Sequence, residues 1–109
     1  MVDEDEVKRV HDLIKKGAEE LGHFFNHDEE FTLSLVKGLL ENRERYGYMS
    51  CPCRLASGEY LKDKDIVCPC EYRDPDVEEY GACYCSLYVS KEIRDKKLRV
   101  GSIPERRKN

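Results

Sequence analysis

Six cysteines, all between residues 51 and 85, constrain this 109-residue chain more than any other feature of its sequence. They form three Cys-x-Cys pairs: Cys51-Pro52-Cys53, Cys68-Pro69-Cys70 and Cys83-Tyr84-Cys85. Fourteen residues separate the first pair from the second, and twelve separate the second from the third. Loops of this length can fold back on a shared centre, so the spacing predicts a single site that is built from all three pairs.

The number of thiols indicates more than a simple metal site. Six thiols exceed the four ligands that a tetrahedral zinc ion or a cubane iron–sulfur cluster requires. Paired cysteines in zinc sites have two or more intervening residues, and this chain has one, so zinc is the second choice. Iron–sulfur ligation tolerates such spacing, and the two surplus cysteines could form a disulfide that is reduced through the cluster. Spacing alone leaves open which four cysteines are the ligands.

The rest of the chain predicts a mainly α fold: a small helical domain with loops and short helices wrapped around an iron–sulfur cluster. Apolar residues recur every three or four positions from Glu4 to about Leu21, and a second pattern covers more than one face from Glu29 to about Tyr46. The length fits a single domain, residues 1–109. We expect a helical half at about 4–47, a cysteine-rich half at 48–90 and a basic C-terminal end at 91–109.

Between and after the cysteine pairs we expect only short elements. Leu55 to Leu61 predicts a short helix, and Asp74-Pro75-Asp76 predicts the start of another, with proline at its first position. Ser86 to Val89 is the one stretch with strand character, whereas residues 23–28 are expected to be a connector. Gly38, inside the second predicted helix, indicates either close packing against a neighbour or a tolerated glycine.

Charge and hydropathy bear on the cellular setting. The start of the chain is acidic and lacks the apolar run of a secretory signal, and no apolar stretch approaches the length of a membrane span. We therefore expect a cytoplasmic protein with no membrane partner, whose thiols stay reduced and bind metal or do redox chemistry. Residues 91–109 carry eight Lys or Arg and three Asp or Glu. Such a run is more often a solvated end than a nucleic-acid site, and the chain has no phosphate-binding glycine loop.

The order Cys-Pro-Cys, Cys-Pro-Cys, Cys-x-Cys resembles the catalytic chain of ferredoxin:thioredoxin reductase. The segments Gly38-Leu39-Leu40 and Arg45-Tyr46-Gly47-Tyr48, which lead to Cys51-Pro52-Cys53-Arg54, are also similar to that family. The resemblance covers roughly residues 5–90 and leaves the basic C-terminal end outside. It implies a thin, disc-like protein with the electron donor on one face and the substrate disulfide on the other.

The resemblance also implies a role for each cysteine. Cys53 and Cys85 would form the redox-active disulfide, with Cys53 as the exposed thiol that attacks the substrate and Cys85 against the cluster. The other four cysteines would hold a 4Fe-4S cluster: Cys51, Cys68, Cys70 and Cys83.

The activity that the resemblance implies is ferredoxin-dependent reduction of a disulfide in a thioredoxin-like protein. Its partners would be ferredoxin or another low-potential electron donor, the thioredoxin-like substrate and, as in the chloroplast members, a second, non-catalytic subunit. The alternative is a non-catalytic binding module stabilised by zinc or an iron–sulfur cluster, or an electron carrier. In either case Cys53 and Cys85 would have no catalytic role.

Residues beside the cysteines raise further questions. Tyr84 stands where the chloroplast-type pattern has histidine, and it either packs over the cluster or marks a change in proton handling, because an unperturbed phenol has a pKa of about 10. Arg54 either lowers the pKa of the neighbouring Cys53 or is an ordinary surface arginine. We expect surface or capping roles for the three histidines, His11, His23 and His27.

Overall fold

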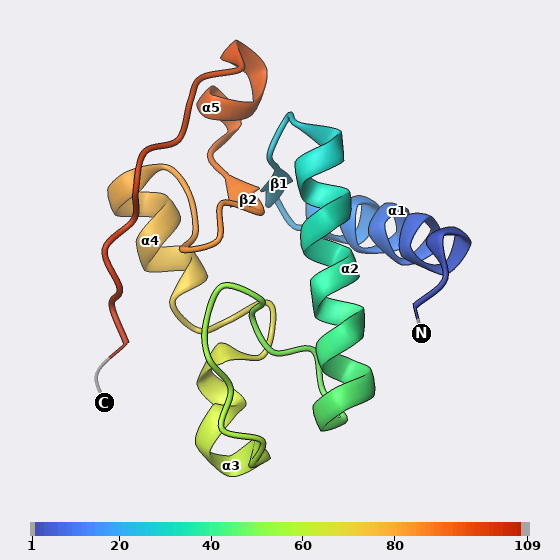
Figure 1. The fold of residues 1–109 in the computed structure, drawn as a ribbon. Helices are drawn as coiled ribbons and strands as arrows, with labels where there is room; N and C mark the ends of the chain where they lie inside the picture. Colours follow the sequence, from blue (N-terminus) through green and yellow to red (C-terminus); the bar gives the residue numbers. More distant parts are fainter. Residues whose placement is uncertain (1, 108–109) are drawn as a thin grey trace.

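Two long helices form one half of the molecule in the computed structural model, which describes residues 2–107. Helix α1 spans Glu4–Glu20 and α2 spans Glu29–Tyr46, as the apolar periodicity predicts. The Asp28 side chain caps α2 by accepting a hydrogen bond from the amide of Phe31. The two helices lie across one another at a steep angle (Figure 1). The fold is mainly α, as predicted.

The core is packed around α2 and includes residues of α1 as well as of the cysteine-rich half. Helix α2 is the most buried helix, because its apolar residues cover more than one face. Five of its side chains are buried: Thr32, Leu35, Val36, Leu39 and Leu40. The same cluster of buried residues includes Phe25, Ile66, Leu87 and the cysteines Cys51, Cys83 and Cys85. The core therefore continues without a break from the helices into the cysteine region.

Three short helical segments support the cysteine-rich half: α3 (Tyr60–Asp63), the 3-10 helix η1 (Lys64–Ile66) and α4 (Arg73–Tyr80). The helix predicted at residues 55–61 is wrong in its position, since α3 begins at Tyr60. The carboxylate of Asp63 accepts hydrogen bonds from the amides of Ser57 and Gly58 and so holds those residues in a turn.

Helix α4 begins two residues before the predicted start. Because its first residue is Arg73, Pro75 occupies the third helical position rather than the first. Gly81 ends the helix in the left-handed conformation, with a φ of 84°.

A two-stranded antiparallel sheet joins the two halves. Strand β1 (Phe24–Phe25) pairs with β2 (Tyr88–Val89), with Phe24 opposite Val89 and Phe25 opposite Tyr88. Strand β2 confirms the predicted strand character at residues 88–89, but Ser86 lies in a turn with a φ of 63°. Residues 23–28 connect α1 to α2, as expected, but they contain β1, which the sequence did not predict. Two residues are too few to show alternation, and the strand exists through its distant partner.

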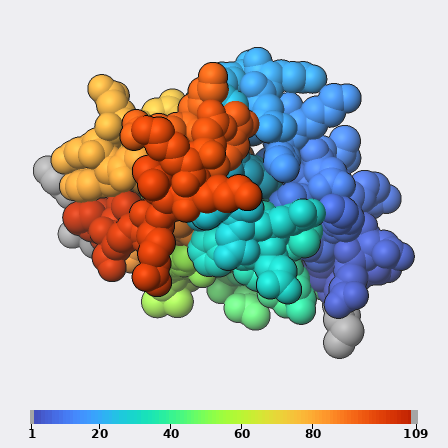
Figure 2. Space-filling model, turned by 90° about the horizontal axis from the view of Figure 1, so that it is seen from above, coloured from blue at the N-terminus to red at the C-terminus, as the bar shows by residue number. Residues whose placement is uncertain are grey.

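The basic C-terminal end is more ordered than its composition predicts. It begins with α5 (Lys91–Lys96), whose first turn is capped by the Ser90 hydroxyl. An irregular segment, residues 98–107, then runs along the outer edge of the molecule past α4 (Figure 1). From above, α5 lies between α4 and the start of α2, and the last described residues lie beside α4 (Figure 2).

The molecule is flattened, with principal extents of 37, 36 and 23 Å. This shape agrees with the disc that the family resemblance implies. Within residues 2–107, no helix is both long and apolar enough to cross a membrane.

Candidate functional site

Backbone hydrogen bonds bring the first two cysteine pairs together. The amide of Cys51 donates to the carbonyl of Ile66 (2.7 Å), and the amide of Cys68 donates to the carbonyl of Met49 (2.8 Å). These two bonds form an antiparallel bridge between the segments that lead into the pairs. Cys51 and Cys68 therefore start from adjacent points of the backbone.

The third pair is attached to the two-stranded sheet. The amide of Cys83 donates to the carbonyl of Tyr88 (2.9 Å), and the amide of Tyr88 donates to the sulfur of Cys83 (3.3 Å). The Ser86 amide closes the turn by donating to the carbonyl of Cys83 (2.8 Å). Because β2 pairs with β1, the helical half determines where Cys83 lies.

Helix α2 supports the first pair through a glycine. A methyl group added at Gly38 would lie 2.8 Å from Cβ of Pro52, which is closer than such atoms approach one another. Of the two interpretations of this glycine, close packing is therefore correct, and the neighbour is the proline between Cys51 and Cys53.

The three pairs share one site, as their spacing predicts. Five of the six cysteines line a single pocket together with two arginines and two tyrosines: Cys51, Cys68, Cys70, Cys83, Cys85, Arg54, Arg73, Tyr84 and Tyr88. Cys53 does not line it and is exposed. The four cysteines that the resemblance assigns to the cluster are thus all pocket-lining.

The thiol groups contact one another at this site. The sulfurs of Cys83 and Cys85 lie 3.8 Å apart, and Cys85 is buried. Interaction with the thiols of Cys53 and Cys85 lowers the pKa of Cys51, and interaction with Cys51 raises the pKa of both Cys53 and Cys85. The exposed Cys53 and the buried Cys85 thus both act on Cys51.

The donors at this site suit an iron–sulfur cluster. The lining atoms that can bind metal are thiol sulfurs, and N–H groups point at them from the Tyr88 amide and from the Arg54 guanidinium, which is 3.5 Å from the sulfur of Cys70. Cysteine sulfurs with such N–H donors are the ligands of Fe–S clusters. Residues 2–107 contain no group of three or more His, Cys, Asp or Glu side chains arranged to hold a single metal ion.

Arg54 is a buried part of the site, not an ordinary surface arginine. Its side chain is 3% exposed, and its guanidinium lies 5.1 Å from the ring centre of Tyr72 and 4.5 Å from that of Tyr84. Burial raises the pKa of Cys70, and the charge of Arg54 opposes that rise. The same charge helps to lower the pKa of Cys51. The sequence suggested that Arg54 acts on Cys53. The structure instead shows Arg54 acting on the sulfurs of Cys51 and Cys70.

Tyr84 packs at the site, as one of its two interpretations predicts. Its ring forms part of the pocket wall and covers the guanidinium of Arg54.

Two of the three histidines are not where the sequence placed them. His11 is buried, with Nε2 2.8 Å from the Thr32 hydroxyl, and so it links α1 to α2. His23 accepts a hydrogen bond from Arg73 (3.1 Å), because β1 brings it beside the wall of the pocket. His27 is exposed, as expected.

Arg73 and Tyr88 were missed by sequence reasoning. The guanidinium of Arg73 lies 4.8 Å from the ring centre of Tyr88, and both side chains line the pocket. Each stands three residues after a cysteine pair, after Cys70 and Cys85 respectively, and this proximity is the signal that could have found them.

The chain is similar to known proteins over most of its length. A family model described as the ferredoxin thioredoxin reductase catalytic beta chain matches residues 1–105. The ferredoxin-thioredoxin reductase catalytic chain of Porphyra purpurea is 26% identical over 93 residues, which are 79% of this chain and 71% of the relative. The chloroplastic catalytic chains of Arabidopsis thaliana and Spinacia oleracea are 28% and 30% identical, over 80% and 69% of this chain and 58% and 49% of their own lengths.

The family model covers almost the whole chain, including the helical half and all three cysteine pairs. The relatives are longer, so the chain spans between about half and about seven tenths of them. On this evidence the chain belongs to the ferredoxin thioredoxin reductase catalytic beta chain family, which is a family of enzymes.

Proposed function

We propose that this chain is a ferredoxin-dependent disulfide reductase that reduces a thioredoxin-like protein. One observation carries the proposal: five cysteines from three loops line one pocket, and the sixth, Cys53, is exposed beside it. A purely structural metal site needs no exposed cysteine next to a buried one. The named activity of the relatives supports the same reaction.

The proposed cofactor is a 4Fe-4S cluster. When bound, the cluster passes electrons singly from the donor to a disulfide beside it. In this chain the proposed ligands are the four pocket-lining cysteines that the family resemblance assigns: Cys51, Cys68, Cys70 and Cys83. The amide of Tyr88 and the guanidinium of Arg54 would donate to the sulfurs of Cys83 and Cys70. Such donors favour the more negative, reduced state.

The proposed reaction uses Cys53 and Cys85 as a disulfide that opens and closes. Two electrons and two protons convert the disulfide to two thiols. Cys53, as a thiolate, attacks the target disulfide, so that a mixed disulfide forms and one target thiolate leaves. Cys85 then attacks the sulfur of Cys53, which restores the Cys53–Cys85 disulfide and releases the second target thiolate. Exposure suits Cys53 for the first attack, and burial suits Cys85 for the second.

The energetics permit this direction of transfer. A plant-type ferredoxin near −400 mV and a thioredoxin near −270 mV differ by about 130 mV, or roughly 6 kcal/mol for two electrons. A reducing cytoplasm, the compartment we propose, would keep the ligand thiols available. The family description as a beta chain supports a second, non-catalytic chain in the working enzyme.

Metal analysis tests the cofactor. The chain purified without oxygen, or reconstituted with iron and sulfide, should be brown and contain about four iron atoms per chain. A colourless protein that contains zinc would contradict the reductase and would favour the metal-stabilised binding module.

Trapping tests the roles of Cys53 and Cys85. With Cys85→Ser, a thioredoxin-like substrate should accumulate as a mixed disulfide on Cys53, because the resolving thiol is gone. With Cys53→Ser, no adduct should form, and ferredoxin-dependent reduction should fall to the background rate. Reduction by Cys53→Ser at the wild-type rate would rule out Cys53 as the nucleophile and would favour the electron carrier.

A further inference from the structure

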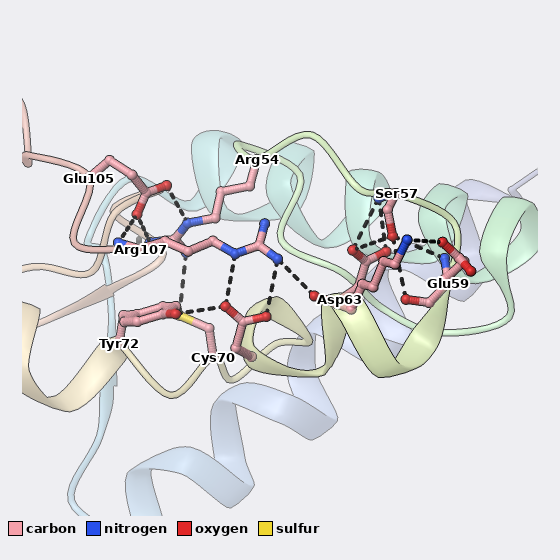
Figure 3. A network of polar contacts seen from close by, with 10 residues as sticks. Arg54, Ser57, Glu59, Asp63, Cys70, Tyr72, Glu105 and Arg107 are labelled. Atoms are coloured by element: carbon pink, nitrogen blue, oxygen red, sulfur yellow. Dashed lines mark hydrogen bonds and ion pairs between the residues drawn. The ribbon is translucent and has the colours of Figure 1, made fainter. Parts of the chain in front are cut away.

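The C-terminal segment is bound to the cysteine-rich half by three consecutive side chains, Glu105, Arg106 and Arg107, here called the clamp. Figure 3 shows two of them in one polar network with Cys70. Each contacts a different part of that half. Glu105 pairs with Arg54, Arg106 pairs with Asp76 and Glu79, and Arg107 pairs with Asp65 and the carbonyl of Lys62.

The contact of Glu105 with Arg54 is bidentate. Nε and one terminal nitrogen of Arg54 donate to the two carboxylate oxygens at 2.7 and 2.8 Å. Such a fork fixes both the position and the plane of a guanidinium. The remaining terminal nitrogen is then directed at the sulfur of Cys70, 3.5 Å away.

Arg107 holds one of the rings that enclose Arg54. It donates to the carboxylate of Asp65 at 2.8 Å, and the same carboxylate accepts the hydroxyl of Tyr72 at 2.6 Å. The Tyr72 ring lies on one face of the Arg54 guanidinium. Two residues of the clamp thus determine where the cation beside Cys70 lies.

We propose that Glu105 is a positioning residue of the redox site: it holds the Arg54 guanidinium against Cys70 and offsets its positive charge. This rests on the proposed function, in which Cys70 binds the cluster. An uncompensated cation beside a ligand sulfur favours the reduced, more negative state and raises the reduction potential. Glu105 keeps the potential lower than Arg54 alone would set it.

Redox titration of the iron-loaded chain tests the charge effect. Glu105→Gln removes the negative charge but keeps an amide oxygen that can still accept a hydrogen bond from Arg54, so it should move the midpoint potential in the positive direction. Arg54→Gln removes the cation and should move the midpoint potential in the negative direction. We expect each change to alter the ratio of reduced to oxidised cluster at a fixed potential about tenfold, which corresponds to about 59 mV for one electron. General loosening of the site would move both variants in the same direction. Glu92→Gln, on α5 in an exposed pair with Lys96, is the matched control and should leave the potential unchanged.

Chemical labelling tests the positioning without depending on iron. Phenylglyoxal should modify the buried Arg54 slowly in the wild-type chain and at least about tenfold faster in Glu105→Ala, which removes both acceptors of its fork, as read by mass spectrometry. Arg9, whose side chain is 69% exposed, provides the internal standard, and Glu92→Gln should label as the wild type does.

The two tests separate this proposal from the proposed function. A wild-type chain that binds no iron overturns the function, and the labelling then decides the proposal on positioning. Arg54 labelled as slowly in Glu105→Ala as in the wild type overturns the positioning role of Glu105. With iron present, an unchanged or more negative midpoint potential in Glu105→Gln overturns the charge effect that is assigned to Glu105.

Discussion

At the scale of single residues, Gly38 and Gly17 form a natural pair for comparison. Both are inside long helices, where alanine is more favourable than glycine by about 0.5–1 kcal/mol. A methyl group at Gly17 would meet nothing within 4 Å, whereas one at Gly38 would meet the ring of Pro52 at 2.8 Å. The ring is rigid and lies between Cys51 and Cys53, so a shift there moves both cysteines.

Gly17→Ala should therefore raise the free energy of unfolding by about 0.5–1 kcal/mol, as measured by urea denaturation. Gly38→Ala should lower it by about 1 kcal/mol, because overpacking outweighs the gain in helix propensity. It should also reduce the iron that the chain retains. Equal stabilisation by both substitutions would show that the Pro52 contact does not constrain the first cysteine pair.

Arg54 shows how far a single residue can depart from its sequence context. A charged residue next to an exposed cysteine predicts either a surface position or an effect on that cysteine. The side chain instead turns inward, where Glu105, 51 residues away in the chain, neutralises it. Local sequence carries no signal for such a partner.

At the scale of elements, Asp63 organises the loop between the first two cysteine pairs. Its buried carboxylate accepts hydrogen bonds from the hydroxyl of Tyr48, which follows α2, and from the amides of Ser57 and Gly58, before α3. Burial alone would raise the pKa of Asp63, but the hydrogen bonds from Tyr48 and Ser57 outweigh it and lower the pKa to about 2.

This shift predicts an acid-dependent loss of stability. The unperturbed pKa is 3.8, so the contribution of Asp63 is fully present above about pH 4 and is lost as the pH falls through about 2. Asp63→Asn should reduce this part of the pH dependence of urea unfolding and cost roughly 1–3 kcal/mol at neutral pH, because an amide donor would face other donors. Asp95→Asn, on the exposed face of α5, is the control and should keep the pH dependence of the wild-type chain. An unchanged pH dependence in Asp63→Asn would contradict the assigned hydrogen bonds.

The short elements were predicted less well than the long helices. Over Glu4–Glu20 and Glu29–Tyr46 the apolar repeat extends over several turns, and both helices were placed within a residue or two. Strand β1 has two residues and α5 has six, which is too few for a repeat to appear. Their positions depend on pairing and capping by residues elsewhere.

At the scale of the whole molecule, the C-terminal segment joins parts of the cysteine-rich half that are far apart in sequence. Arg106 pairs with the fully buried Asp76, 30 residues away, and with Glu79 in the next turn of α4. One carboxylate oxygen of Asp76 has no hydrogen-bond partner among residues 2–107. The ion pair with Arg106 therefore provides much of the stabilisation of this buried carboxylate.

Arg106→Gln should therefore destabilise the chain by more than the loss of about 0.5 kcal/mol that is typical of an exposed ion pair. Lys96→Gln, which breaks an exposed pair with Glu92, serves as that reference. In an Asp76→Asn background the effect of Arg106→Gln should shrink, because the buried charge is gone. Additive losses in this double-mutant cycle, measured by urea unfolding, would show that the two residues are not coupled.

The two long helices, the grouping of the cysteine pairs at one site and the family could all be predicted from the sequence. These features rest on the periodicity of apolar residues and on the spacing of cysteines along the chain, both of which are visible without the fold. By contrast, the burial of Arg54 at Cys70, the contact of His23 with Arg73 at the pocket wall, and the clamp of the basic C-terminal end on the cysteine-rich half appear only in the folded chain. Each of these depends on a contact between residues brought together by the fold, and the energy of such a contact leaves no pattern in the residues on either side.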